Sequence, residues 1–237
     1  MPSYRRLDHA HITKTLEALH GRIVARFPDA NLAKLCEQLI AVSRETAGCV
    51  ATLESPIWPI RIGAGIAVLV LITIFVTVAG LTLSAPAAMS ISDLVQTIEA
   101  AVNDVVFFGI AVFFILSIET RVKRRRALRI LHELRSLAHI VDMHQLTKDP
   151  ERLATTRADE TPGASKRATG ADLGKYLDFC SELLSVISKL AALFAQHFND
   201  GIVLAAVNEI EALTTGLSGK IWQKITILDR SMAPVES

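Results

Sequence analysis

Two long apolar runs dominate the pattern of hydrophobic and polar positions along the chain. The first, Ile62–Leu83, contains no charged residue, and as a helix it would be about 33 Å long. Because the hydrocarbon layer of a bilayer is about 30 Å thick, this run predicts a membrane span. The second, Val105–Ile118, reaches full length only with the apolar residues from Ile98 onward. We predict spans at about 62–83 and 98–119. The alternative, a buried helix of a soluble domain, is more plausible for the second run than for the first, but a span is favoured for both.

Outside these runs, apolar residues recur three and four positions apart, the spacing of amphipathic helices. The pattern covers residues 8–27, continues to about Glu54, follows the second span to about residue 146, and returns at about 172–198 and 202–228. No segment alternates long enough to predict a strand. Isolated helices of this kind are marginal in water, so we expect their apolar faces to cover one another, within one chain or between subunits. The predicted fold class is an all-α membrane protein, a two-span transmembrane hairpin with a cytoplasmic helical bundle.

Breaks in these patterns divide the chain into regions. Ser55–Pro56 and Pro59 interrupt the helical pattern before the first span. Residues 147–171 are polar, with two prolines, a composition typical of flexible linkers. The predicted regions are a cytoplasmic N-terminal helical hairpin at 1–57, a transmembrane hairpin with a short external loop at 58–120, a cytoplasmic extension of the second span at 121–146, a linker at 147–171 and a C-terminal helical hairpin at 172–237.

The distribution of charge predicts the orientation in the membrane. The segment between the spans, residues 84–104, contains no Lys or Arg, whereas five basic residues follow the second span. Basic residues stay on the cytoplasmic side, so we expect both termini in the cytoplasm and the short connection outside. Trp58, just before the first span, is expected to act as an interface anchor. Because the first apolar run begins only at Ile62, we expect no signal peptide, and we predict a bacterial inner (plasma) membrane location.

The five basic residues are also candidates for contact with anionic lipid head groups, which attract such residues by on the order of 1 kcal/mol per charge. They are Arg121, Lys123, Arg124, Arg125 and Arg126. The positive-inside rule explains the same residues, and the two interpretations are compatible. We expect no nucleic-acid partner, because the net charge is only +1 and aromatic residues are sparse outside the spans.

A few polar residues lie within or beside the apolar runs. A carboxylate at membrane depth is costly and usually faces protein or water, which draws attention to Asp104. The candidates for a polar path through the membrane are Asp104, Asn103, Thr73, Thr77 and Ser117. The alternative is that Asp104 lies at the outer interface in water and that the two threonines serve close helix packing. This alternative is favoured over a polar path.

One cluster could bind a metal ion. His132, His139 and Asp142 lie on roughly one side of a predicted helix, with His144 nearby, and imidazole and carboxylate groups are ligands for transition metals. The simpler interpretation is a set of solvated polar residues. His132-Glu133 resembles the start of a zinc-protease helix, but Ser136 stands where the second histidine is required. No phosphate-binding loop, nucleophile elbow or paired acid–base constellation occurs, so we expect no catalytic residue, no metal and no cofactor.

These observations favour a protein that works by association rather than by catalysis. The first hypothesis is a non-enzymatic, two-pass inner-membrane scaffold or signalling module, acting through its cytoplasmic helices and forming a homo-oligomer. Membrane lipids and an unidentified protein are the expected partners. The alternative hypothesis is an oligomeric pore or ion-conducting membrane effector, motivated by Asp104 and the polar positions of the first span.

Overall fold

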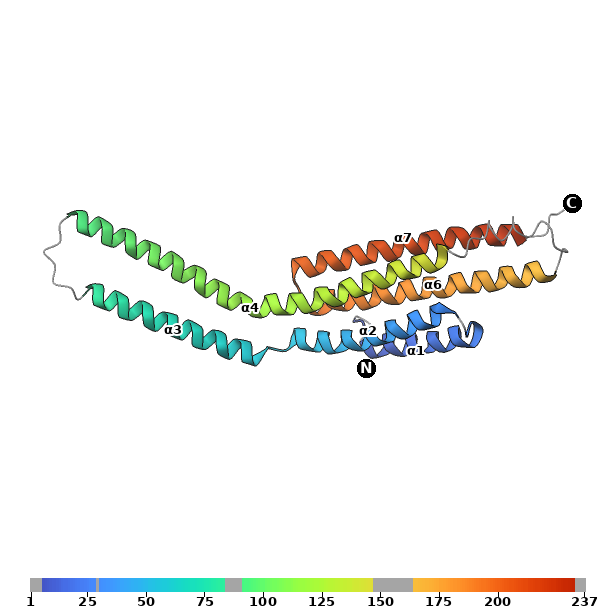
Figure 1. The fold of residues 1–237 in the computed structure, drawn as a ribbon, viewed down its shortest axis with the longest axis horizontal. Coiled ribbons are helices and arrows are strands. Elements are labelled where there is room, and N and C mark those ends of the chain that lie inside the picture. Colours follow the sequence, from blue (N-terminus) through green and yellow to red (C-terminus); the bar gives the residue numbers. More distant parts are fainter. Residues whose placement is uncertain (1–5, 29, 84–90, 147–163, 233–237) are drawn as a thin grey trace. The chain divides into compact units, whose positions relative to one another are not determined.

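The computed structural model describes residues 6–28, 30–83, 91–146 and 164–232, in which every regular element is an α-helix (Figure 1). The helices are α1 (His9–Arg26), α2 (Asn31–Glu54), α3 (Trp58–Leu83), α4 (Ile91–Leu146), α6 (Ala164–His197) and α7 (Gly201–Met232). The prediction of an all-helical chain is therefore confirmed for the described residues.

The longest helix, α4, contains 56 residues and continues from the second apolar run through the basic residues without interruption, as predicted. The boundary of α6 differs from the predicted one. This helix begins at Ala164, so it includes residues 164–171 of the segment predicted as a linker. These residues include Ala, Lys and Arg, which have high helix propensity, so a polar composition here is compatible with a helix. The remainder of the predicted linker, residues 147–163, lies outside the described residues.

Local sequence signals position the ends of α1. The Asp8 side chain accepts a hydrogen bond of 2.9 Å from the Ala10 N–H, as an N-cap residue does at a helix start. At the other end, the Phe27 N–H donates to the Ile23 carbonyl at 2.7 Å. Between these ends, Ile12, Leu16, Leu19 and Ile23 are buried along one face, as the helical spacing predicts.

The described residues form two compact units. The first contains α1, α2, the part of α4 from Arg126 onward, α6 and α7, and its apolar side chains form one core. Each helix contributes nearly inaccessible side chains, among them Leu16, Leu39, Leu134, Leu177 and Val203. Burial of one such side chain stabilises by about 1.5–3 kcal/mol, so helices that would be marginal alone stabilise one another. The apolar faces of this unit, which we call the helical bundle, are thus covered within a single chain.

Aromatic and ionic contacts attach the turn between α1 and α2 to α6. The Phe27 ring lies edge-on to Tyr176 and to Phe179, with centroid distances of 5.7 and 6.3 Å. Such aromatic pairs contribute about 0.5–1.5 kcal/mol beyond the area they bury. Two ion pairs also join α1 to α6, one between Arg22 and Glu182 and one between Arg26 and Asp172. This turn is therefore fixed by contacts that are distant in sequence.

The second unit consists of residues 55–125, with α3 and the first part of α4. It contains the two helical segments that are long and apolar enough to cross a membrane, and neither is buried by the rest of the chain. Large apolar side chains are instead exposed along both, including Leu69 at 64%, Phe107 at 69% and Phe113 at 71%. The coarse prediction of two apolar helices of membrane-spanning length is confirmed.

Candidate functional site

The polar residues of α3 are satisfied within their own helix. The Thr73 hydroxyl donates to the Leu69 carbonyl at 2.9 Å, and the Thr77 hydroxyl donates to the carbonyls of Thr73 and Ile74 at 2.9 and 2.8 Å. Such back-bonding is the usual way for a threonine to satisfy its hydroxyl inside an apolar helix. These contacts satisfy both hydroxyls without a water-filled path.

The polar residues of α4 show two different environments. The Ser117 hydroxyl donates to the Phe114 carbonyl at 2.8 Å and accepts a hydrogen bond of 3.2 Å from Arg121 Nε. Asn103 and Asp104 are both exposed. The structure thus places the Asp104 carboxylate on the surface of α4, where it is open to water, lipid or another helix.

A cluster around Glu119 joins the start of α3 to α4 inside the second unit. Glu119 Oε2 accepts from Arg61 Nε at 2.8 Å, while Oε1 lies 3.0 Å from the Lys123 ammonium. The backbone N–H of Ile57, one residue before α3, also donates to Oε1 at 3.3 Å. We call this set of four residues the Glu119 cluster. One carboxylate therefore receives three donors from two segments about sixty positions apart in sequence.

Burial makes the Glu119 cluster more than an ordinary surface ion pair. The side chains of Glu119 and Lys123 are only 15% and 11% exposed, whereas that of Arg61 is 58% exposed. A buried charge is tolerated only when it is paired and hydrogen-bonded, and both conditions are met here. Our sequence analysis did not single out Glu119. The available signal was a lone acidic residue between the second apolar run and the basic residues, opposite in predicted hairpin geometry to Arg61.

The five basic residues after the second span are not equivalent. Lys123 is buried and paired with Glu119, so it is a poor candidate for lipid contact. Arg121, Arg125 and Arg126 are exposed, and Arg124 is half-buried. The Arg121 guanidinium lies 4.8 Å from the centroid of the Phe114 ring, which orients it along α4. The three exposed arginines are the strongest candidates for anionic head groups.

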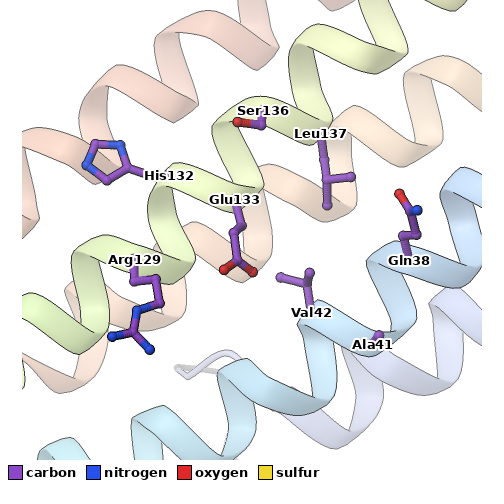
Figure 2. Close-up of a pocket in the computed structure, with 8 residues that line it drawn as sticks. All are labelled: Gln38, Ala41, Val42, Arg129, His132, Glu133, Ser136 and Leu137. Carbon is purple, nitrogen blue, oxygen red and sulfur yellow. The ribbon is translucent and has the colours of Figure 1, made fainter.

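A groove in the helical bundle runs between α2 and α4 (Figure 2). Its volume is about 570 Å³, and Glu133 points from α4 toward Val42 of α2. Gln38 and Ala41 complete the α2 side, and Arg129, His132, Ser136 and Leu137 complete the α4 side. Most of the exposed surface of the groove is apolar, and Arg129 and Glu133 contribute opposite charges to it.

The candidate metal ligands are not gathered into a site. His132 and His139 are exposed, while Asp142 and His144 are half-buried on the same helix. Asp142 accepts a hydrogen bond of 2.5 Å from the Gln145 side chain. In the parts of the chain that the structure describes, no group of three or more His, Cys, Asp or Glu side chains is placed to hold a metal ion.

The three cysteines are buried and unpaired with each other. Burial raises the pKa of the Cys36 and Cys180 thiols to about 12, and it raises the pKa of Cys49 as well. The thiolate is the reactive form of cysteine, and these environments disfavour it. The cysteines therefore act as small apolar residues of the core.

Comparison with protein-family models, curated proteins and solved structures found no match for this chain. Its function has to be argued from its own residues.

Proposed function

We propose that this protein is a non-enzymatic, two-pass membrane scaffold that holds its helical bundle at the cytoplasmic face of a bacterial inner membrane. The observation that carries the proposal is a contrast between the two units. The apolar faces of the bundle are covered within one chain, whereas the apolar side chains of α3 and of the first part of α4 are exposed along their length. In a bilayer the apolar side chains of such helices contact lipid tails instead of water, so their exposure carries no hydrophobic cost.

Two contacts support an antiparallel hairpin of spans. Arg61 near the start of α3 contacts Glu119 of α4, and further along α3 the Phe75 ring lies 5.1 Å from that of Phe108. Residue numbers rise along one helix as they fall along the other, which is the order of an antiparallel pair. Trp58, 66% exposed at the first position of α3, suits the water–lipid interface on the same side as the Glu119 cluster.

The absence of a catalytic arrangement among the described residues supports a role in association. The α2–α4 groove supplies an apolar surface for a protein partner, and Trp222 and Ile227 of α7 are also exposed. Within the spans, the positions of Gly65 and Gly109 have open space where a side chain would stand. Small residues let a neighbouring helix approach closely in a membrane, so we include a homo-oligomer in the proposal.

The mass of the assembly in lipid nanodiscs, measured by native mass spectrometry, tests this proposal first. A defined homo-oligomer, together with a specific protein partner captured by crosslinking in native membranes, is the expected result. A monomer in nanodiscs that captures no partner in native membranes would overturn the scaffold proposal. A matched variant, Gly109→Leu, should lower the oligomer fraction without unfolding the bundle, because Gly109 lies outside its core.

A pore or ion-conducting effector is the second candidate, supported by the exposed Asp104 carboxylate on an otherwise apolar stretch of α4. Two spans enclose nothing alone, so this candidate requires a closed ring of about four or more subunits. A monomer or dimer in nanodiscs would eliminate it and leave the scaffold proposal standing.

A further inference from the structure

One face of α7 is exposed along most of the helix and carries no charge. Its members follow one another at alternating intervals of three and four residues, the spacing that keeps side chains on one side of an α-helix. We call this set the α7 face; its members, all exposed, are Ala205, Asn208, Ala212, Thr215, Gly219, Trp222 and Thr226. The face is about 32 Å long. Because the water-facing side of a bundle helix ordinarily carries charged residues, an uncharged face of this length is a candidate contact surface.

A large aromatic side chain and a groove lie next to each other on the α7 face. Trp222 is 64% exposed. A groove of about 390 Å³ runs between α6 and α7, and Thr215, Gly219 and Trp222 line its α7 side. A side-chain carbon added at Gly219 would meet nothing within 4 Å beyond the backbone of its own helix. The backbone there is therefore open to close approach, and the Trp222 ring stands beside it as an anchor for a second helix.

Two contacts give the direction of α7 relative to α4. Arg135 of α4 donates to Glu209 at 2.9 Å, and Lys224 donates to the Gln145 carbonyl at 3.2 Å. Residue numbers rise together along the two helices, so α7 runs parallel to this part of α4. Copies inserted in one membrane share their orientation, and a two-fold axis that relates them lies along the membrane normal. Such an axis brings two α7 helices together in parallel.

The charges beside the α7 face suit a parallel pair. Glu209 lies on the side of the face that contacts α4 through Arg135, whereas Lys189 of α6 lines the groove on the other side. A two-fold axis turns the Lys189 side of one copy toward the Glu209 side of the other. Lys189 lines the groove together with Thr215, and Thr215 is about 9 Å along α7 from Glu209, within the combined reach of two long side chains. Because both side chains are exposed, this pairing favours one register and adds little affinity.

The size of the α7 face limits how strong such a contact can be. A strip about 32 Å long and about 10 Å wide has a footprint of about 320 Å² per copy, well below the area of about 800 Å² per partner in a standard stable interface. The contact would therefore be weak between free bundles. Copies already held together through their spans meet at a much higher effective concentration, at which a weak contact forms.

We propose that the α7 face binds the α7 face of a second copy of this chain, in a parallel, two-fold symmetric pair anchored by Trp222. The inference rests on the homo-oligomer of the proposed function and adds its cytoplasmic surface, direction and register. Like positions meet across the axis, so that Thr215 lies opposite Thr215 of the second copy and Thr226 opposite Thr226. The Trp222 ring of each copy packs against Trp222 and the open backbone at Gly219 of the other.

Disulfide formation by cysteine variants of the full-length protein in liposomes tests the pair. Thr215→Cys and Thr226→Cys each place two thiols across the axis, and oxidation with copper phenanthroline should give a covalent dimer on a non-reducing gel. The matched control is Lys220→Cys, at an exposed position of α7 outside the face. Its rate of dimer formation should be about tenfold lower, because a disulfide requires Cα atoms within about 7 Å. The three native cysteines are buried, so the wild type gives the background.

A second pair of variants tests the anchor. In the Thr226→Cys protein, Trp222→Ala should slow dimer formation about tenfold, because truncation of a central aromatic residue is among the costliest changes at an interface. Ile227→Ala, at a position that is 45% exposed but lies outside the face, should leave the rate unchanged.

Three outcomes would overturn the proposal. The first is a rate for Thr215→Cys and Thr226→Cys no higher than that for Lys220→Cys. The second is an equal effect of Trp222→Ala and Ile227→Ala. The third is capture of a different protein by Thr215→Cys in native membranes with no covalent dimer. An oligomer in nanodiscs without these crosslinks would overturn this inference alone, whereas a monomer there would overturn the homo-oligomer of the proposed function as well.

Discussion

Replacing Glu119 with Gln removes one negative charge from the Glu119 cluster and changes almost nothing in side-chain size. The amide oxygen can still accept one hydrogen bond, but the Lys123 ammonium, 11% exposed, no longer has the negative charge of Glu119 3.0 Å away. Removal of one partner from a buried ion pair costs about 3–5 kcal/mol. The Arg61 contact adds little to this, because Arg61 is 58% exposed and pairs of that kind contribute about 0–1 kcal/mol. We therefore expect a loss of about 3 kcal/mol at this junction, the low end of the range, because Lys123 retains some access to solvent.

Hydrogen exchange measured by mass spectrometry in nanodiscs reports this loss directly. A cost of about 3 kcal/mol corresponds to a local opening equilibrium about two orders of magnitude larger. Glu119→Gln should therefore speed the exchange of backbone amides from Ile57 to Arg61 by about a hundredfold, because the Ile57 N–H donates to Glu119. Arg61→Gln should produce a smaller acceleration of less than about tenfold.

The control for this experiment is Arg125→Gln, which removes a charge from an exposed residue of the same helix. It should leave the exchange of these amides unchanged. If Glu119→Gln exchanged like the wild type, or if Arg125→Gln had the same effect, the conclusion that the Glu119 cluster holds the start of α3 to α4 would be refuted.

Three further predictions follow from the core, the thiols and the exposed carboxylate. Leu134→Ala, at a fully buried position of α4, should destabilise the bundle by about 2–5 kcal/mol in urea unfolding followed by circular dichroism; Leu116→Ala, 65% exposed in the apolar part of α4, should not. The raised pKa values of Cys36 and Cys180, about 12 each against an ordinary value of about 9, mean that their contribution to stability is complete below pH 9 and is lost as the pH rises toward 12. The urea concentration at the unfolding midpoint should therefore fall as the pH rises above 9. It should fall less steeply in the double variant with Ala at both positions, and identical pH dependence in the two proteins would contradict this prediction. Asp104→Asn should leave the ion flux of protein-containing liposomes unchanged if the protein is a scaffold, whereas a reproducible change in flux would support the pore.

Several features of the fold are local properties of the sequence and were predictable from it. The length and apolarity of the run at 62–83 do not depend on any other part of the chain, so its membrane-spanning length follows from residue rise alone. The spacing of Ile12, Leu16, Leu19 and Ile23 predicts the buried face of α1 for a similar reason, because side chains three and four positions apart share one side of a helix. The boundary at Ala164 was missed because composition distinguishes a polar helix from a linker poorly.

Other features needed the tertiary structure, because they depend on which surfaces meet. The apolar faces of the cytoplasmic helices could have paired within one chain or between subunits, and periodicity is the same in both cases; the structure brings them together in one core. Glu119 and Arg61 are 58 positions apart, and only the packing of α3 against α4 brings the carboxylate to Arg61 and to the Ile57 N–H. Lys123, four positions further along α4, is by contrast a local partner.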